Sequence, residues 1–68
     1  MYKIGDRVKF TFLSEELFGE IIGKIDKVKW KIKDDSGMVY PFIYGNEPKK
    51  VKGVKYETPL GIIISKIN

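Results

Sequence analysis

Residues 27–33 alternate strictly between lysine and a large apolar side chain. Val28, Trp30 and Ile32 take the even positions, and lysine takes every odd position. Successive side chains of a β-strand point to opposite faces, so this order places the apolar residues on one face and the lysines on the other. The stretch therefore predicts a strand with one buried face.

A similar pattern predicts further strands along the chain. Residues 6–13 alternate, with Val8, Phe10 and Phe12 sharing one face. Less regular runs rich in β-branched and aromatic residues predict the remaining strands at 18–25, 38–44 and 61–67. Residues 14–17 separate the first two strands, and they are read either as one helical turn capped by Ser14 or as a loop.

Glycine, proline and aspartate indicate where these strands bend or end. Gly19 and Gly23 lie inside the second predicted strand, where glycine is typical of a bulge or a sharp bend. Asp26-Lys27 predicts a tight link to the third strand. Asp34-Asp35-Ser36-Gly37 predicts a turn in which Gly37 takes a positive φ. Pro41 predicts an edge strand or a bulge.

Residues 45–60 are the irregular part of the chain. Gly45-Asn46-Glu47-Pro48 predicts one turn, and Thr58-Pro59 predicts another break. Residues 49–56 lie between them and are read either as a short extra strand or as a basic loop.

These elements predict an all-β fold without a helix of ordinary length. We expect residues 1–68 to form a single small barrel of five antiparallel strands, or six with residues 49–56, and a long basic excursion before the last strand. Closure into a barrel would hide the exposed sheet edges. The alternation predicts one core made of Val8, Phe10, Phe12, Ile21, Ile25, Val28, Trp30, Ile32, Ile62 and Ile64.

Residue usage argues against an enzyme. The 68 residues include no cysteine and no histidine, which removes disulfides, thiolate metal ligands and the commonest acid/base group. The paired carboxylates are Glu15-Glu16 and Asp34-Asp35, and adjacent residues on a strand or turn normally point apart. No serine has a histidine to activate it. We therefore expect no catalytic activity, no cofactor and no metal.

The longest purely apolar run is Ile62-Ile63-Ile64, which is far shorter than a membrane span. The first residues are not an apolar signal segment either. Both observations lead us to expect a cytoplasmic protein that does not enter a membrane.

Three stretches resemble SH3-like barrels of the KOW and Tudor type. Tyr2–Phe10 is similar to their opening, in which a hydrophobic residue, Gly and Asp precede a Val. Phe18–Ile25 resembles their second strand, and Trp30–Gly37 resembles their third strand with its turn. The resemblance covers residues 2–44 and implies a small SH3-like barrel. Small proteins of this type are common in bacteria and phages, which implies a phage or mobile-element accessory factor.

Positive charge lies in two blocks. Residues 24–33 contain five lysines and one acid, Asp26, and residues 49–56 contain four lysines. In residues 34–48, which lie between these blocks, every charged residue is acidic. Twelve of the thirteen basic residues are lysine, which attracts phosphate without reading bases as specifically as arginine. The lysines singled out as partner contacts are Lys27, Lys29, Lys31 and Lys33 on the third strand and Lys49, Lys50, Lys52 and Lys55, with Tyr56, in the excursion.

Nine aromatic residues are many for this length. Tyr40 and Tyr44 share one parity of the fourth strand, and tyrosines exposed beside lysines would suit base stacking or a protein interface. A Tudor-like aromatic cage would need several converging rings, for which Tyr2, Phe18, Tyr40 and Tyr44 are the candidates.

The favoured function is a small binding module that acts through protein–protein contact. The alternative is a KOW-like domain that binds nucleic acid without sequence specificity through its lysines. Acids interrupt the basic surface and arginine is almost absent, which favours a protein partner.

Overall fold

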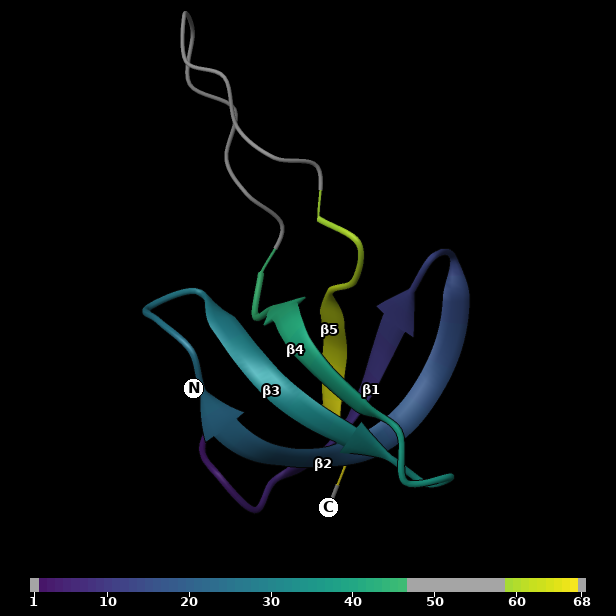
Figure 1. Ribbon diagram of the computed structural model, residues 1–68, viewed down its shortest axis with the longest axis horizontal. Helices are drawn as coiled ribbons and strands as arrows, with labels where there is room; N and C mark the ends of the chain where they lie inside the picture. Colours follow the sequence, from purple (N-terminus) through teal and green to yellow (C-terminus); the bar gives the residue numbers. More distant parts are fainter. Residues whose placement is uncertain (1, 47–58, 68) are drawn as a thin grey trace, which may run out of the picture.

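The computed structural model describes residues 2–46 and 59–67, and five strands in this part of the chain form one antiparallel sheet (Figure 1). The strands are β1 Arg7–Phe12, β2 Glu15–Lys24, β3 Lys29–Asp34, β4 Val39–Tyr44 and β5 Ile63–Ile67. Their order across the sheet is β4-β3-β2-β1-β5. The all-β prediction is confirmed for these residues, which include no helix long and apolar enough to cross a membrane. The second lysine block, Tyr56 and the extra strand predicted at 49–56 lie outside the described residues.

β1 and β2 form a hairpin with a two-residue turn at Leu13 and Ser14. Both residues have a positive φ, 49° and 68°, which is the conformation of a type I′ turn. This turn matches the right-handed twist of the flanking strands, so pairing resumes at once with Glu15 opposite Phe12. Of the two readings of residues 14–17, the helical turn is therefore wrong. The loop is also shorter than predicted, because β2 begins at Glu15, three residues earlier than predicted.

β2 bends where glycine was predicted to bend it. Pairing with β3 shifts register between Ile21 and Gly23, so β2 contains one extra residue there. Gly19 has a different role, because a Cβ on it would lie 2.5 Å from the carbonyl oxygen of Lys33. A side chain at this position would separate β2 from β3.

β4 contains a bulge at its proline. The register passes from Ile32 opposite Tyr40 to Trp30 opposite Ile43, so Pro41 and Phe42 together face Lys31. Tyr40 and Ile43 consequently both point into the core although they are three residues apart. β4 also lies at one edge of the sheet, so both expectations for Pro41 are confirmed.

β5 contains a similar irregularity. The register passes from Ser65 opposite Lys9 to Ile63 opposite Phe10, which leaves Ile64 as an extra residue. Ile63 is therefore buried and Ile64 is exposed, while Ile62 is only partly buried. The predicted core positions in this strand are thus wrong by one residue.

The core is one cluster inside the curved sheet. Trp30, Ile32 and three other predicted residues are buried, and Phe12 packs partly against them. Ile25 and Val28 are exposed because they lie in the turn between β2 and β3, so their assignment to the core is wrong. The buried residues are Val8, Phe10, Ile21, Trp30, Ile32, Tyr40, Ile43 and Ile63.

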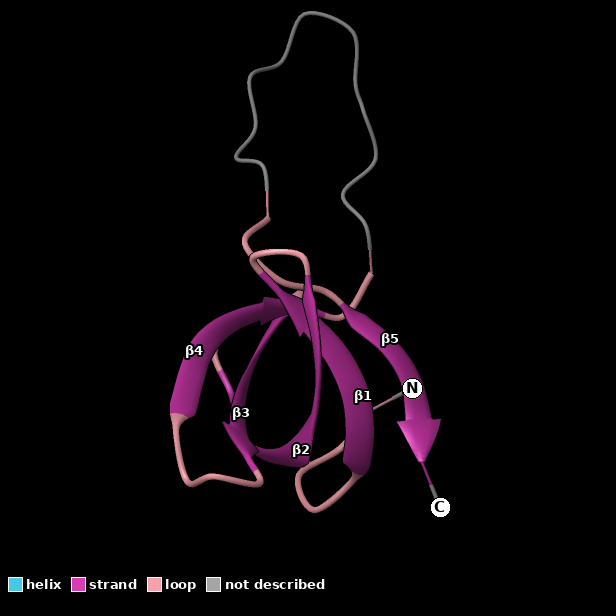
Figure 2. Cartoon of the chain, turned by 90° about the vertical axis from the view of Figure 1, so that its right-hand side faces the viewer, coloured by secondary structure: helices cyan, strands magenta, loops and turns pink. Residues whose placement is uncertain are grey.

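The sheet curls strongly without closing (Figure 2). β4 and β5 form its two edges, and one isolated bridge, Tyr44 with Ile62, joins the end of β4 to the segment before β5. There the backbone N–H of Tyr44 donates to the carbonyl of Gly61 at 3.0 Å. The described part is thus an open sheet in which the end of one edge strand contacts the residues before the other.

Candidate binding surface

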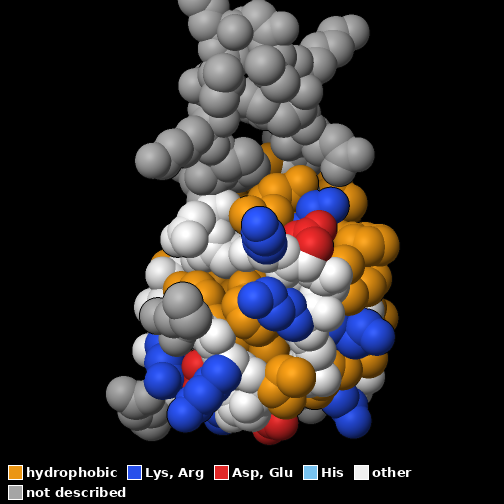
Figure 3. Space-filling view, turned by 90° about the vertical axis from the view of Figure 1, so that its left-hand side faces the viewer, with side chains coloured by type: hydrophobic (Ala, Val, Ile, Leu, Met, Phe, Trp, Pro, Cys, Tyr) orange, Lys and Arg blue, Asp and Glu red, His pale blue; other side chains and the backbone are white. Residues whose placement is uncertain are grey.

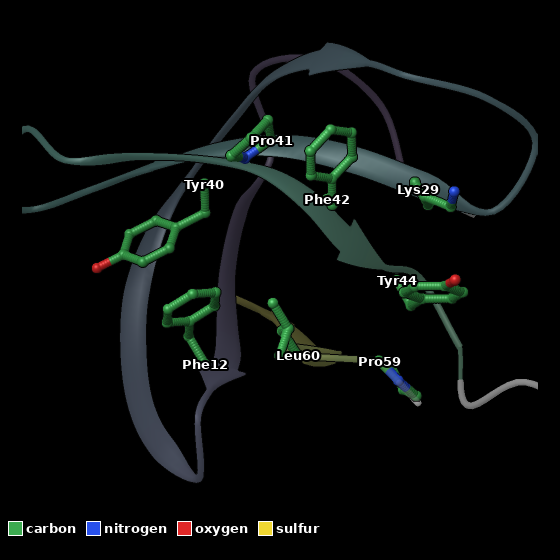
Figure 4. Close-up of a pocket in the computed structure, with 8 residues that line it drawn as sticks. All are labelled: Phe12, Lys29, Tyr40, Pro41, Phe42, Tyr44, Pro59 and Leu60. Atoms are coloured by element: carbon green, nitrogen blue, oxygen red, sulfur yellow. The ribbon is translucent and has the colours of Figure 1, made fainter. Parts of the chain in front are cut away.

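An apolar hollow of about 480 Å³ lies beside this open part of the sheet (Figure 4). Its walls come from β4, from the end of β1, from the start of β3 and from the segment that leads into β5. The lining residues are Phe12, Lys29, Tyr40, Pro41, Phe42, Tyr44, Pro59 and Leu60. The lining therefore consists of four aromatic residues, two prolines, a leucine and one lysine.

The hollow has a rigid aromatic end. The rings of Phe12 and Tyr40 meet edge to face, with centroids 4.9 Å apart, and Tyr40 also packs against Phe10 at 5.3 Å. Tyr40 is only 7% exposed, so the core fixes its ring. Phe42 and Leu60 are 58% and 59% exposed and offer apolar surface to a partner.

Asp34 fixes the hydroxyl of Tyr40. Its Oδ2 accepts a hydrogen bond from that hydroxyl at 2.8 Å, and its Oδ1 accepts bonds from the Ser36 hydroxyl and from the backbone N–H groups of Ser36 and Met38. Gly37 has a φ of 93°, so the turn predicted over residues 34–37 is confirmed. The bond from Ser36, followed by the one from Tyr40, lowers the pKa of Asp34 to about 2, and the bond to Asp34 raises the pKa of Tyr40.

The lowered pKa of Asp34 predicts that its carboxylate stabilises the fold in a pH-dependent way. Because the pKa of Asp34 falls from 3.8 to about 2 on folding, its contribution is complete above pH 4 and is lost as the pH drops through 2. We expect Asp34→Asn to lower the melting temperature at pH 7, and the deficit should shrink between pH 4 and pH 2. Thermal unfolding of both proteins by circular dichroism from pH 2 to 7 tests this. A deficit that stays constant over the range would contradict it.

Lys29 is the charged residue in the lining. Its Nζ lies 3.6 Å from Oδ2 of Asp26 and 5.7 Å from the ring centroid of Tyr44. Asp26 also organises the turn before β3, because its Oδ1 accepts the backbone N–H groups of Val28 and Lys29 at 2.9 Å each. The hydrogen bond from Val28 contributes most to lowering the pKa of Asp26. The link between β2 and β3 is therefore longer than the predicted Asp26-Lys27 pair.

The third-strand lysines are only partly placed as predicted. Lys29, Lys31 and Lys33 alternate with the buried residues of β3, whereas Lys27 lies in the preceding turn. Lys33 is opposite the acid Glu20 in the register.

Acids accompany the basic residues elsewhere on the described surface. The remaining ion pairs join Arg7 to Asp35, Lys9 to Glu16 and Lys66 to Asp6. On the face in Figure 3, basic side chains are scattered over apolar and uncharged surface, and acidic side chains lie directly beside some of them.

Two of the four cage candidates line the hollow, at opposite ends of it (Figure 4). Tyr40 and Tyr44 both line the hollow, whereas Tyr2 packs edge-on against Trp30 and Phe18 is exposed on β2. Lys29 is the third lining residue that was selected as a site residue from the sequence, and the remaining lining residues were not selected. The signal available for some of them was the run Tyr40-Pro41-Phe42-Ile43-Tyr44, in which aromatic residues take every second position and a proline lies between the first two.

Three of the four acids in the pairs Glu15-Glu16 and Asp34-Asp35 have structural partners. Asp34 belongs to the turn, Asp35 pairs with Arg7, and Glu16 pairs with Lys9. Within residues 2–46 and 59–67 no three acids gather in a way that could hold a metal ion.

Comparison with known proteins finds no counterpart: no protein-family model, no curated protein and no solved structure matches the chain. Neither a family nor a related protein therefore supplies a function. The case for a function rests on the geometry and chemistry of the hollow.

Proposed function

We propose that this chain is a small non-enzymatic binding module, built as an SH3-like barrel, that contacts another protein through the aromatic hollow. The observation that carries the proposal is the hollow itself, which exposed Phe42 and Leu60 line together with buried Tyr40. The strand order, the strong curl and the contact between Tyr44 and Ile62 support the SH3-like architecture.

The chemistry of the lining favours protein side chains as the ligand. Aromatic residues that stay rigid lose little entropy on binding, and they contribute much of the energy of protein interfaces. Proline and leucine offer apolar contacts without hydrogen bonds, which suits aliphatic or aromatic side chains better than the polar edges of nucleobases.

The competing proposal is that lysines bind nucleic acid. The observation in its favour is Lys29 above the ring of Tyr44, since stacking on an aromatic ring next to a cation is how single strands are often held. The ion pairs of Lys9 with Glu16 and of Lys66 with Asp6 weaken this reading, because each paired acid opposes an approaching phosphate.

A titration with defined peptides tests the protein-binding proposal. The probes are hexapeptides with two central residues drawn from Leu, Phe, Trp and Pro, flanked on both sides by Glu, Gln or Lys and closed by blocked glycines. We expect the best of them to shift the amide NMR signals of Tyr40, Phe42 and Tyr44. Phe42→Ala should weaken that peptide at least about tenfold, as an interface aromatic does.

Val39→Ala supplies the matched control, since Val39 is also exposed on β4 but does not line the hollow. It should leave the affinity unchanged, and both variants should keep their fold because both side chains are exposed. The proposal fails if no probe shifts these signals. It fails in favour of nucleic acid if a 12-nucleotide oligo(dT) binds instead and its affinity falls steeply with salt.

A further inference from the structure

We propose that the hollow selects a protein segment in which a carboxylate adjoins apolar side chains, and that Lys29 binds this carboxylate. The inference rests on the proposed function and deepens it, because it names the chemistry of the partner. Two features of the site carry it: the polar groups that remain in the lining, and the way in which Lys29 is held.

The lining offers few polar groups to a ligand. The hydroxyl of Tyr40 is already bonded to Asp34, so the side-chain groups left are the ammonium of Lys29 and the hydroxyl of Tyr44. Figure 4 shows both at one end of the hollow, with Phe12 and Tyr40 at the other. Apolar surface with a cation at one end complements an apolar ligand that carries one negative charge.

The structure holds Lys29 in place before any ligand arrives. Its backbone N–H donates to Asp26, and its carbonyl accepts from the N–H of Ile25 at 3.0 Å. Its side chain is only 26% exposed and reaches over the ring of Tyr44, which is its partner across the β3–β4 register. A cation that is already ordered loses less entropy when it binds an anion.

Asp26 leaves Lys29 available to a second carboxylate. The distance of 3.6 Å between Nζ and Oδ2 is longer than the 2.7–2.9 Å of a strong charge-assisted hydrogen bond. Asp26 does not line the hollow, so it approaches Lys29 from outside that space. A carboxylate inside the hollow thus competes with Asp26 for the ammonium group of Lys29. A cationic ligand would instead be repelled by this ammonium group.

Two conservative substitutions test the inference. Lys29→Gln removes the cation, and we expect it to weaken the best Glu-flanked peptide about three- to tenfold while changing its Gln-flanked counterpart less than about twofold. Asp26→Asn keeps an oxygen for the hydrogen bonds of the turn and removes the competing charge. It should strengthen the Glu-flanked peptide about twofold or more. Affinities are measured by isothermal titration calorimetry on the full chain.

Lys27→Gln is the matched control, because Lys27 lies in the same turn and outside the lining. It should change neither affinity by more than about twofold. The preference for Glu over Gln should also shrink in 0.5 M salt, as screening weakens an ion pair near the surface.

The outcomes separate this inference from the proposed function. In one outcome, Gln-flanked or Lys-flanked peptides bind the hollow as tightly as Glu-flanked ones, and Lys29→Gln changes none of these affinities. The hollow then binds protein, but the carboxylate inference is wrong. If no peptide of any charge binds, the proposed function itself fails. If Lys29→Gln weakens oligo(dT) and no peptide binds, the anion is a phosphate of nucleic acid and the inference is overturned.

Discussion

Replacing Gly61 with alanine is expected to destabilise the fold severely. A Cβ on Gly61 would collide with the backbone carbonyl oxygen of Thr11 and lie 2.7 Å from Cδ1 of Ile43. Neither atom can move away cheaply, because Thr11 belongs to the β1–β2 hairpin and Ile43 is buried in the core. We expect a loss of at least about 3 kcal/mol, as for severe overpacking, and a melting temperature at least about 12 °C lower.

The same change should affect the hollow. Gly61 accepts the hydrogen bond from the N–H of Tyr44 and directly follows Leu60, so it holds two walls of the hollow together. Thermal unfolding by circular dichroism measures the loss. Gly23→Ala is the control, because a Cβ there would contact Lys31 at an ordinary 3.6 Å. Equal melting temperatures for the two variants would show that Gly61 is not tightly packed against Thr11.

The strands were predictable where alternation is strict. Trp30 and Ile32 in β3, and Val8 and Phe10 in β1, are buried as their parity predicts. Such runs report directly which face of a strand meets the core, so the sequence sufficed to predict an all-β fold.

The sequence did not show which residues beyond each bulge face the core. One extra residue in a strand reverses the face of every residue beyond it, and the hydrophobic pattern of three consecutive isoleucines does not reveal where this happens. Ile63 is therefore buried in place of Ile62 and Ile64. The turn at Leu13 and Ser14 was missed for a related reason: type I′ turns are usually recognised by asparagine, aspartate or glycine, and neither residue is one of these.

The residues of the proposed binding surface were predictable in part. Tyr40, Tyr44 and Lys29 were selected from the sequence, and all three line the hollow. Phe12 was assigned to the core. Because it is only partly buried, it packs against the core and also lines the hollow. Leu60 and Pro59 could not be connected with β4 from the sequence, because only the contact between Tyr44 and the segment before β5 brings them there.

Trp30→Ala is expected to have the largest effect among the core residues predicted from the sequence. Trp30 is 8% exposed, and its ring packs against the backbone of Gly45, where an added Cβ would lie 3.0 Å from Nε1. Tyr2 meets the ring edge-on at 6.4 Å, and Nζ of Lys24 lies 5.3 Å from its centroid. Removing a buried tryptophan costs about 3–5 kcal/mol, which is comparable to the whole stability of many domains this small.

The variant should therefore be largely unfolded at 37 °C, as followed by the loss of its cooperative thermal transition in circular dichroism. Trp30→Phe tests how much of the loss comes from removing an aromatic ring altogether. This variant keeps an aromatic face toward Tyr2 and Gly45 and removes less volume than alanine does. It should retain a cooperative transition at a temperature between those of the parent and the alanine variant. A Trp30→Ala protein that melts within about 2 °C of the parent would mean that β3 does not place this side chain in the core.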